Sequence, residues 1–315
     1  MLWDSLFALA LALPLLPLAL LALRARSVTR RLAVLKARPR GRRAHDAGAA
    51  SEELLATLRQ QHGVDSPLPS GGESVNELCA RFLRARNGDV TAAAEMLAAD
   101  TRWRQAMRCE ELVRQTAEEV LGCTAMQLEK LDAILPVASV GHDRRGQPVV
   151  YKHFGAGCTL GVALDMHPLE TLSRYNTWLN EGFSQRLAER RAQQWVIVID
   201  ALGWHPRQAT PRAMGVLRDM ANTDAMHYPE RLAAIVVVNA PALLATTWAV
   251  ISSWLGETTR RKVQILSVRR PDAARDVLLE MIASEQLPRQ FGGDAPPLAP
   301  WPEASGFPVG PPARK

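Results

Sequence analysis

Alternating apolar patterns divide the second half of the chain into strands and helices. From residue 232 to residue 256 no side chain is charged. The first part, 234–238, is rich in β-branched residues and ends at Asn239-Ala240-Pro241, which is typical of a buried strand. Proline is favoured at the first position of a helix, so Pro241 marks the start of the second part. The segment therefore predicts a strand and then a helix.

The helix predicted over 241–255 is apolar around most of its circumference. Apolar residues recur at helical spacing, and those that define the stripe are Leu244, Trp248, Ile251 and Leu255. Such a helix is either an ordinary core helix or a cover for another apolar surface. Because it follows an apolar strand, we interpret it as a lid over a hydrophobic cavity.

The same alternation of strands and helices extends over residues 126–294. Pro168 and the pair Thr210-Pro211 supply helix starts. Alternating strands and helices predict an α/β domain with a mostly parallel sheet. The predicted strands are 134–139, 147–153, 194–200, 233–239 and 263–268, and the predicted helices are 168–193, 210–227, 241–255 and 272–284.

Two further segments flank this α/β domain. Residues 51–125 carry helix-start signals, among them a capping box from Ser74 to Glu77 and a cap at Asp89. We predict a small all-helical domain there, with a loop at 63–72. The tail 295–315 holds seven of the chain's 21 prolines. We predict that this tail is disordered and is a candidate segment for binding a protein partner.

The basic charge of the chain is concentrated in one short segment. The net charge is +6, with 38 basic and 32 acidic residues. Nine of the basic residues lie between Arg24 and Arg43, so the remainder has 29 basic against 32 acidic residues. A net charge of −3 outside that segment argues against nucleic-acid binding.

An apolar segment precedes these basic residues. Residues 1–23 contain one charged side chain, Asp4, and about 20 apolar residues span a bilayer. We therefore predict a transmembrane signal anchor at 1–23 and a basic juxtamembrane linker at 24–50 that binds an anionic membrane surface. The chain would be a single-pass membrane protein whose C-terminal domain faces the cytosol. A cleaved targeting segment, with an organellar location, is the alternative.

No arrangement of residues matches an enzyme site. Gly155-Ala156-Gly157 lacks the continuation of a dinucleotide-binding loop, and Gly182 to Arg186 lacks the second glycine of a nucleophile elbow. The seven histidines and four cysteines show no metal-ligand or disulfide spacing. Asp200, which ends an apolar strand, is a candidate for catalysis or for shaping the next loop. We predict no catalytic residues, no metal and no cofactor.

Three segments of the chain resemble the CRAL-TRIO lipid-binding family. The most specific is Tyr228-Pro229-Glu230-Arg231-Leu232 followed by Asn239-Ala240-Pro241. The helical region agrees through Arg81-Phe82-Leu83-Arg84-Ala85-Arg86, and the closing segment through Phe291-Gly292-Gly293. The resemblance covers residues 74–294 and implies a lipid cavity closed by a movable helix, here 241–255.

The resemblance also implies a site for a phosphatidylinositol headgroup. Arg86, Thr259 and Lys262 would bind the phosphate or the inositol ring, because a phosphate needs cations and the ring hydroxyls need acceptors and donors. Glu230 would balance the charge of Lys262, and Arg231 would support Glu230. Each of these five residues taken alone is an ordinary surface charge or hydroxyl, and their joint match to the family carries the prediction.

The family's phosphatidylcholine site is not retained. Its hydroxyl-bearing positions correspond to Trp195 and Ile197, which cannot supply those hydrogen bonds. A second, more hydrophobic ligand, such as a sterol or an isoprenoid, is left open. The sequence thus predicts a membrane-anchored lipid transfer or presentation protein that binds phosphatidylinositol. The alternative is a lipid-sensing module that recruits a partner without transferring lipid.

Overall fold

The computed structural model describes residues 43–157 and 160–298. The chain divides into two compact units, residues 1–47 and 48–315, and nearly all described residues belong to the second. The predicted segment 1–23 and most of the predicted linker 24–50 and tail 295–315 lie outside the described residues. The helix expected to begin near residue 51 begins earlier, because α4 spans Arg43–His62.

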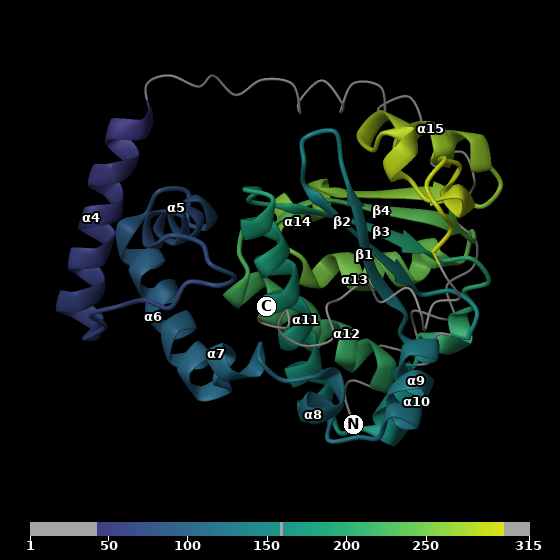
Figure 1. Cartoon of the computed structure of the whole chain (residues 1–315), viewed down its shortest axis with the longest axis horizontal. Coiled ribbons are helices and arrows are strands. Elements are labelled where there is room, and N and C mark those ends of the chain that lie inside the picture. Colours follow the sequence, from purple (N-terminus) through teal and green to yellow (C-terminus); the bar gives the residue numbers. More distant parts are fainter. Residues whose placement is uncertain (1–42, 158–159, 299–315) are drawn as a thin grey trace, which may run out of the picture. The chain divides into compact units, whose positions relative to one another are not determined.

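A five-stranded sheet forms the centre of the second unit (Figure 1). Its strands lie side by side in chain order: β1 (Val137–His142), β2 (Pro148–His153), β3 (Trp195–Asp200), β4 (Leu232–Ala240) and β5 (Val263–Ser267). The last four strands run parallel, while β1 pairs antiparallel with β2.

The sheet is therefore mixed: three of its four strand pairings are parallel, in agreement with the predicted mostly parallel sheet, and only β1 pairs antiparallel. A tight turn joins β1 to β2. The Asp143 carboxylate accepts hydrogen bonds from the backbone N–H groups of Arg145 (2.9 Å) and Gln147 (2.8 Å), and Gly146 has a positive φ of 80°. A connection this short leaves no room for a crossover helix, so the two strands must be antiparallel.

Helices cover both faces of the sheet (Figure 1). One face carries Val150 and Trp195 and packs against α11 (Leu169–Glu189), near α10 (Leu160–Met166) and α12 (Pro211–His227). The other face packs its valines against α15 (Pro271–Met281) and the segment that ends at Phe291. After β4 the chain forms two helices, α13 (Leu244–Trp254) and α14 (Glu257–Arg261), before it enters β5.

The helices before the sheet form their own apolar cluster. Leu54 of α4 packs with residues of α5 (Val75–Ala85) and α6 (Val90–Met107). Ser74 and Asp89 cap α5 and α6 as the sequence predicts. Of the next three helices, α7 (Cys109–Leu112) and α8 (Ala117–Leu121) pack against α11, and α9 (Ala125–Ile134) packs against α8 and α10.

Across the helices between residues 43 and 298 that the structure describes, none combines the length and apolarity needed to cross a bilayer. The longest, α11, has 21 residues but carries several charges, and the apolar α13 has only 11 residues. About 20 apolar residues are needed. The predicted transmembrane helix, and with it the single-pass membrane location, is therefore contradicted. The segment 1–23 on which it rested lies outside the described residues.

Candidate functional site

The turn Tyr228–Arg231, which joins α12 to β4, is held in an unusual conformation. Glu230 has φ of 59°, in the left-handed region that few residues other than glycine adopt. Side chains from three distant elements hold the surrounding carbonyls. Arg81 donates to Pro229 (3.0 Å), Gln194 to Glu230 (3.0 Å) and Lys262 to Leu232 (2.8 Å). This bracing fixes the direction in which the Glu230 side chain leaves the turn.

Glu230 and Lys262 meet beside this turn. The Lys262 ammonium lies 3.5 Å from the Glu230 carboxylate, and the two side chains are 21% and 23% exposed. They come together because β4 and β5 are neighbouring parallel strands and both residues lie just before them. Thr259 is half-buried in α14, and its carbonyl accepts the backbone N–H of Lys262 (2.9 Å). The pair is thus accessible to a polar ligand but anchored by the backbone.

Arg231 points away from this pair into the protein. Its side chain is 4% exposed, and its guanidinium binds the Glu73 carboxylate at 2.6 Å. Arg81 binds the same carboxylate through two nitrogens, at 2.7 and 3.0 Å. Burial alone would raise the pKa of Glu73, but hydrogen bonding and the charge of Arg81, together with that of Arg231, hold it below its usual value. We call Glu73, Arg81 and Arg231 the charged seam.

Arg86 lies apart from these residues at the C-terminal end of α5. Its side chain is exposed, and its guanidinium donates to the carbonyl of Ala85 at 3.4 Å. The structure therefore brings together Glu230 and Lys262, with Thr259 in the adjacent helix and Arg231 behind the turn. Sequence reasoning missed Glu73, Arg81 and Gln194. Arg81 does open the arginine-rich motif, but nothing local in the sequence shows that it is buried.

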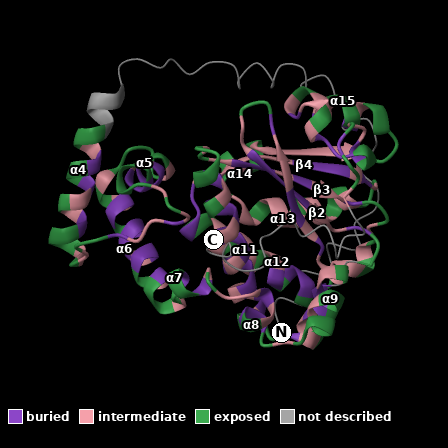
Figure 2. Ribbon diagram, viewed as in Figure 1, coloured by how far each residue is buried: buried purple, intermediate pink, exposed green. Residues whose placement is uncertain are grey.

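The helix α13 lies over one face of the sheet, and its own side chains are poorly covered by the rest of the protein. None of its residues is buried, and Figure 2 shows it without the colour of buried residues. Trp248, Ile251 and Leu255 are half-buried, and Leu244 packs partly against Val237. The helix α13 therefore keeps much of its apolar surface only partly covered.

The sheet beneath α13 is incompletely covered too. Val237 on this face is buried, but five apolar residues around it remain half-buried, and they are Ile197, Ile199, Ile235, Val263 and Ile265. By contrast, Trp195 at the start of β3 is buried, and its ring lies 5.7 Å from the ring of Phe183 in α11. Of the two predicted cavity residues in β3, Ile197 belongs to the incompletely covered surface and Trp195 to the core.

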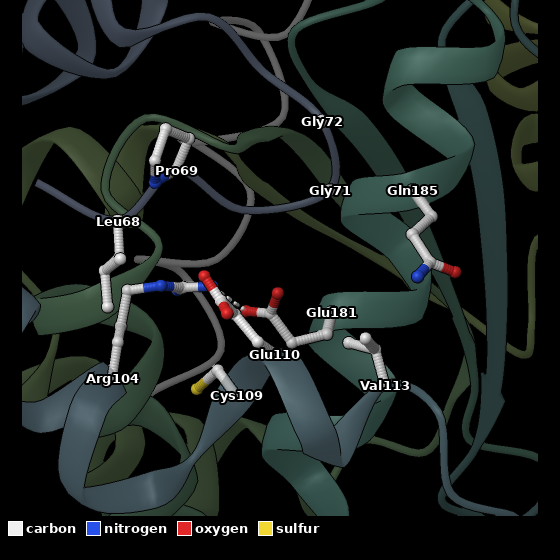
Figure 3. Close-up of a pocket in the computed structure, with 10 residues that line it drawn as sticks. All are labelled: Leu68, Pro69, Gly71, Gly72, Arg104, Cys109, Glu110, Val113, Glu181 and Gln185. Atoms are coloured by element: carbon white, nitrogen blue, oxygen red, sulfur yellow. Dashed lines mark hydrogen bonds and ion pairs between the residues drawn. The ribbon is translucent and has the colours of Figure 1, made fainter.

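A separate pocket of about 370 Å³ lies between the loop 68–72, α6, α7 and α11 (Figure 3). Inside it, Arg104 and Glu181 point toward each other, with 2.7 Å between their nitrogen and oxygen atoms. The Tyr228 hydroxyl donates to the same oxygen of Glu181 at 2.7 Å. Because Glu181 is already satisfied by these donors, the arrangement is that of a structural ion pair.

The described part of the chain offers no catalytic or metal constellation. Between residues 43 and 298, as described, no group of three histidine, cysteine or acidic side chains could hold a metal ion. Asp200, the one acid at a strand end that sequence analysis considered for catalysis, accepts hydrogen bonds from Leu202 N (3.0 Å) and Asn239 Nδ2 (2.8 Å). These bonds shape the two loops at this edge of the sheet.

The mixed five-stranded sheet between two helical layers defines an α/β fold. The family model for the CRAL/TRIO domain matches residues 136–293, half of the chain. The chain therefore belongs to this family, which confirms the resemblance predicted from the sequence.

Several relatives match over most of this chain. "Protein real-time" of Aedes aegypti is 24% identical over 220 residues, which are 68% of this chain and 32% of that protein. The phosphatidylinositol/phosphatidylcholine transfer proteins SFH12 and SFH14 of Arabidopsis thaliana are 24% and 26% identical over 79% and 77% of this chain. This chain spans 44% and 41% of their lengths, respectively. The two Arabidopsis thaliana relatives are named as transfer proteins, which agrees with the prediction of a lipid-binding protein that is not an enzyme.

Among solved structures, Sfh5 has the same fold. The TM-score is 0.58 over 78% of this chain and 85% of Sfh5, with 13% sequence identity. At that identity the likeness shows the arrangement of helices and strands alone.

Proposed function

We propose that this protein binds phosphatidylinositol together with a second hydrophobic ligand, and transfers or presents these lipids. The family and the relatives named as phosphatidylinositol/phosphatidylcholine transfer proteins support the ligand class. The observation that carries the proposal is the Glu230–Lys262 pair, half-exposed at the edge of the incompletely covered sheet and held in place by a braced turn.

The headgroup would bind at this pair. Lys262 supplies a cation for the phosphate, and Glu230 supplies acceptors for ring hydroxyls while balancing the lysine charge. Thr259, in the helix that ends beside Lys262, supplies a hydroxyl. Arg86, exposed at the end of α5, would have to turn toward the phosphate from the solvent side. Arg231 would act from behind, by holding the turn through Glu73 rather than by touching the lipid.

The acyl chains would lie between α13 and the sheet. Each methylene removed from water contributes about 0.8 kcal/mol, and the half-buried surface of Ile197, Ile235 and Ile265 would gain this coverage. A membrane offers the chains nearly the same apolar environment, so the tails retain the lipid in the protein but hardly select it. Selectivity would therefore come from the headgroup site. For loading, α13 must move aside at a phospholipid surface.

The test is exchange of phosphatidylinositol between vesicles by the full chain. Lys262→Ala and Glu230→Ala, singly and together, should abolish phosphatidylinositol uptake while circular dichroism shows a folded protein. The matched control is the exposed pair Glu257–Arg261 on α14, whose side chains are 65% and 72% exposed. Removing both of those charges should leave uptake unchanged.

Two outcomes of this experiment would argue against the proposal. Wild-type uptake by the folded Glu230→Ala/Lys262→Ala protein would exclude the headgroup site. Lipid that stays bound, without exchange between vesicles, would instead indicate the lipid-sensing module. In that case we expect the protein to recruit a protein partner through the proline-rich segment 295–315.

A further inference from the structure

Lys152 places an ammonium group on the apolar face of the sheet. Side chains alternate along a strand, so Lys152 lies on the same face as Val150, which packs in the core cluster of α11. Its neighbour in β3 is Ile199. A lysine is an unusual residue here, because the surrounding positions on this face are apolar.

The Lys152 ammonium has no hydrogen-bond acceptor and no ion-pair partner among the residues that the structure describes. Burial lowers its pKa, and the charge of Asp224 opposes that effect without contacting it. The side chain nevertheless remains half-buried, so some of its surface is accessible. A desolvated ammonium without a partner is costly, and native proteins rarely keep one unless something binds it.

The Asp224 carboxylate of α12 faces the same region, and one of its two oxygens already accepts hydrogen bonds. Its Oδ1 atom accepts hydrogen bonds from the side-chain amides of Asn180 (2.7 Å) and Asn176 (3.3 Å), both buried one turn apart on α11. Within the described chain, its Oδ2 atom has no donor. The two amides hold the carboxylate in place, so its second oxygen is presented in a fixed direction.

The charges of this pair favour a neutral ligand group over an anion. Lys152 offers an open donor and Asp224 an open acceptor, and together they carry no net charge. A carboxylate or phosphate would be attracted by the ammonium but repelled by Asp224. A hydroxyl can accept from the ammonium and donate to the carboxylate at the same time.

We propose that Lys152 and Asp224 bind the hydroxyl group of a lipid alcohol. This rests on the proposed function, because it names the chemical class of the second hydrophobic ligand. The hydrocarbon part would lie along Ile197 and Ile199 under α13. The site replaces the hydrogen-bonding groups that Trp195 and Ile197 cannot supply.

The test uses three probes that share one hydrocarbon tail, titrated into the full chain: oleyl alcohol, its methyl ether and oleate. The ether keeps an acceptor but has no hydrogen to donate. The wild-type protein should bind the alcohol at least about tenfold more tightly than the ether, because a site built around a hydroxyl rejects its analogue without one. Oleate should bind no more tightly than the alcohol.

Lys152→Met, which keeps an unbranched apolar side chain but removes the ammonium group, should bind alcohol and ether equally and should still bind the ether as the wild type does. The control Lys130→Met, at an exposed position of α9, should keep the preference. Asp224→Asn provides a second variant, and it too should lose the preference. Lys152→Met should also raise the midpoint of thermal unfolding without ligand, whereas loss of a purely structural lysine would lower it.

Three results would overturn the inference: equal binding of alcohol and ether by the wild type, a preference that survives in Lys152→Met, or tighter binding of oleate than of the alcohol. Phosphatidylinositol exchange measured on the same samples separates the two proposals. Intact exchange with no alcohol preference overturns this inference alone. Failed exchange with an intact preference overturns the headgroup site instead.

Discussion

The charged seam and the helix α13 differ in an unexpected direction within one domain: the charged residues are buried, and the apolar ones are not. In the seam, Glu73, Arg81 and Arg231 are almost completely buried, yet each finds charged or carbonyl partners at hydrogen-bonding distance. In α13 the residues are uncharged and seven of the eleven are apolar, yet no side chain is buried. The buried charges thus find partners in one region, although the Nε atom of Arg231 has none among the described residues, while apolar surface is left incompletely covered in the other.

This difference separates a rigid part of the candidate site from a movable one. Removing one partner from a buried ion pair leaves the remaining charge buried without a counter-charge, which is costly. The seam can therefore hardly rearrange. It fixes the turn that carries Glu230 and therefore the headgroup pair. A helix with half-exposed apolar side chains loses little contact when it moves, which suits a lid. Under the proposed function, the rigid region would recognise the lipid and the movable region would admit it.

The largest expected effect comes from breaking the seam. Glu73→Ala leaves the guanidinium groups of Arg81 and Arg231 buried together without a counter-charge, which should lower the free energy of unfolding by about 3–5 kcal/mol. Chemical denaturation of the full chain measures this. The control is Asp65→Ala, which breaks a pair with Arg59 whose side chains are 84% and 64% exposed. That change should cost about 0–1 kcal/mol.

Similar losses for Glu73→Ala and Asp65→Ala would show that the seam is hydrated and flexible. The division into a rigid and a movable region would then fail on its rigid side.

A smaller effect distinguishes α13 from the core, because the same atoms can be removed in both regions. Leu172→Ala in α11 empties a fully buried position and should cost about 2–5 kcal/mol in the free energy of unfolding. Leu244→Ala in α13 removes a half-buried side chain, leaves no closed cavity and should cost under about 1.5 kcal/mol. Lipid exchange should respond in the opposite order among folded variants, with Leu244→Ala slowing it more.

Equal losses of stability at residues 172 and 244 would show that α13 is an ordinary core helix, the alternative that the sequence left open. The lid would then have to be another element.

Much of the fold could be predicted from local pattern. The strand expected at 233–239 is β4, Leu232–Ala240, and the helix expected at 210–227 is α12, Pro211–His227. Proline, threonine caps and β-branched runs act over a few residues, so a sequence displays them directly. The strand expected at 134–139 is shifted to Val137–His142, because Ile134 still belongs to α9. An apolar run alone cannot distinguish a helix end from a strand start.

Less of the candidate site could be predicted from the sequence. Arg81 and Pro229 are 148 positions apart, and no periodicity signals that such residues touch. The family motif pointed to Glu230 and Lys262, but not to the residues that brace the turn behind them. Lys152 escaped notice for a related reason. A single charged residue inside a strand pattern is usually an exposed one, and only the register of the sheet places it on the inner face.

The smallest expected effect is a pH dependence of the free energy of unfolding. It arises at the edge of the sheet where β4 leads toward α13. His153, Asp200 and Asn239 lie at the ends of three neighbouring strands, with the His153 ring nitrogen 3.5 Å from the Asp200 carboxylate. A hydrogen bond with Asp200 raises the pKa of His153, burial opposes this, and the charge of Asp200 adds to the rise. Since Asn239 also has a positive φ of 54°, this cluster holds the connection to α13 in a fixed geometry.

A raised pKa in the folded state means that protonated His153 stabilises the protein. This contribution should be fully present below pH 6.5, the usual pKa of histidine, and should be lost as pH rises through the higher folded value. The measurement is the difference in free energy of unfolding between the wild type and His153→Gln from pH 5 to 9, which cancels the titration of other groups. The difference should shrink with rising pH. If the His153 difference is instead flat, the edge beside α13 does not respond to pH, and only the packing contrast between the seam and the lid remains.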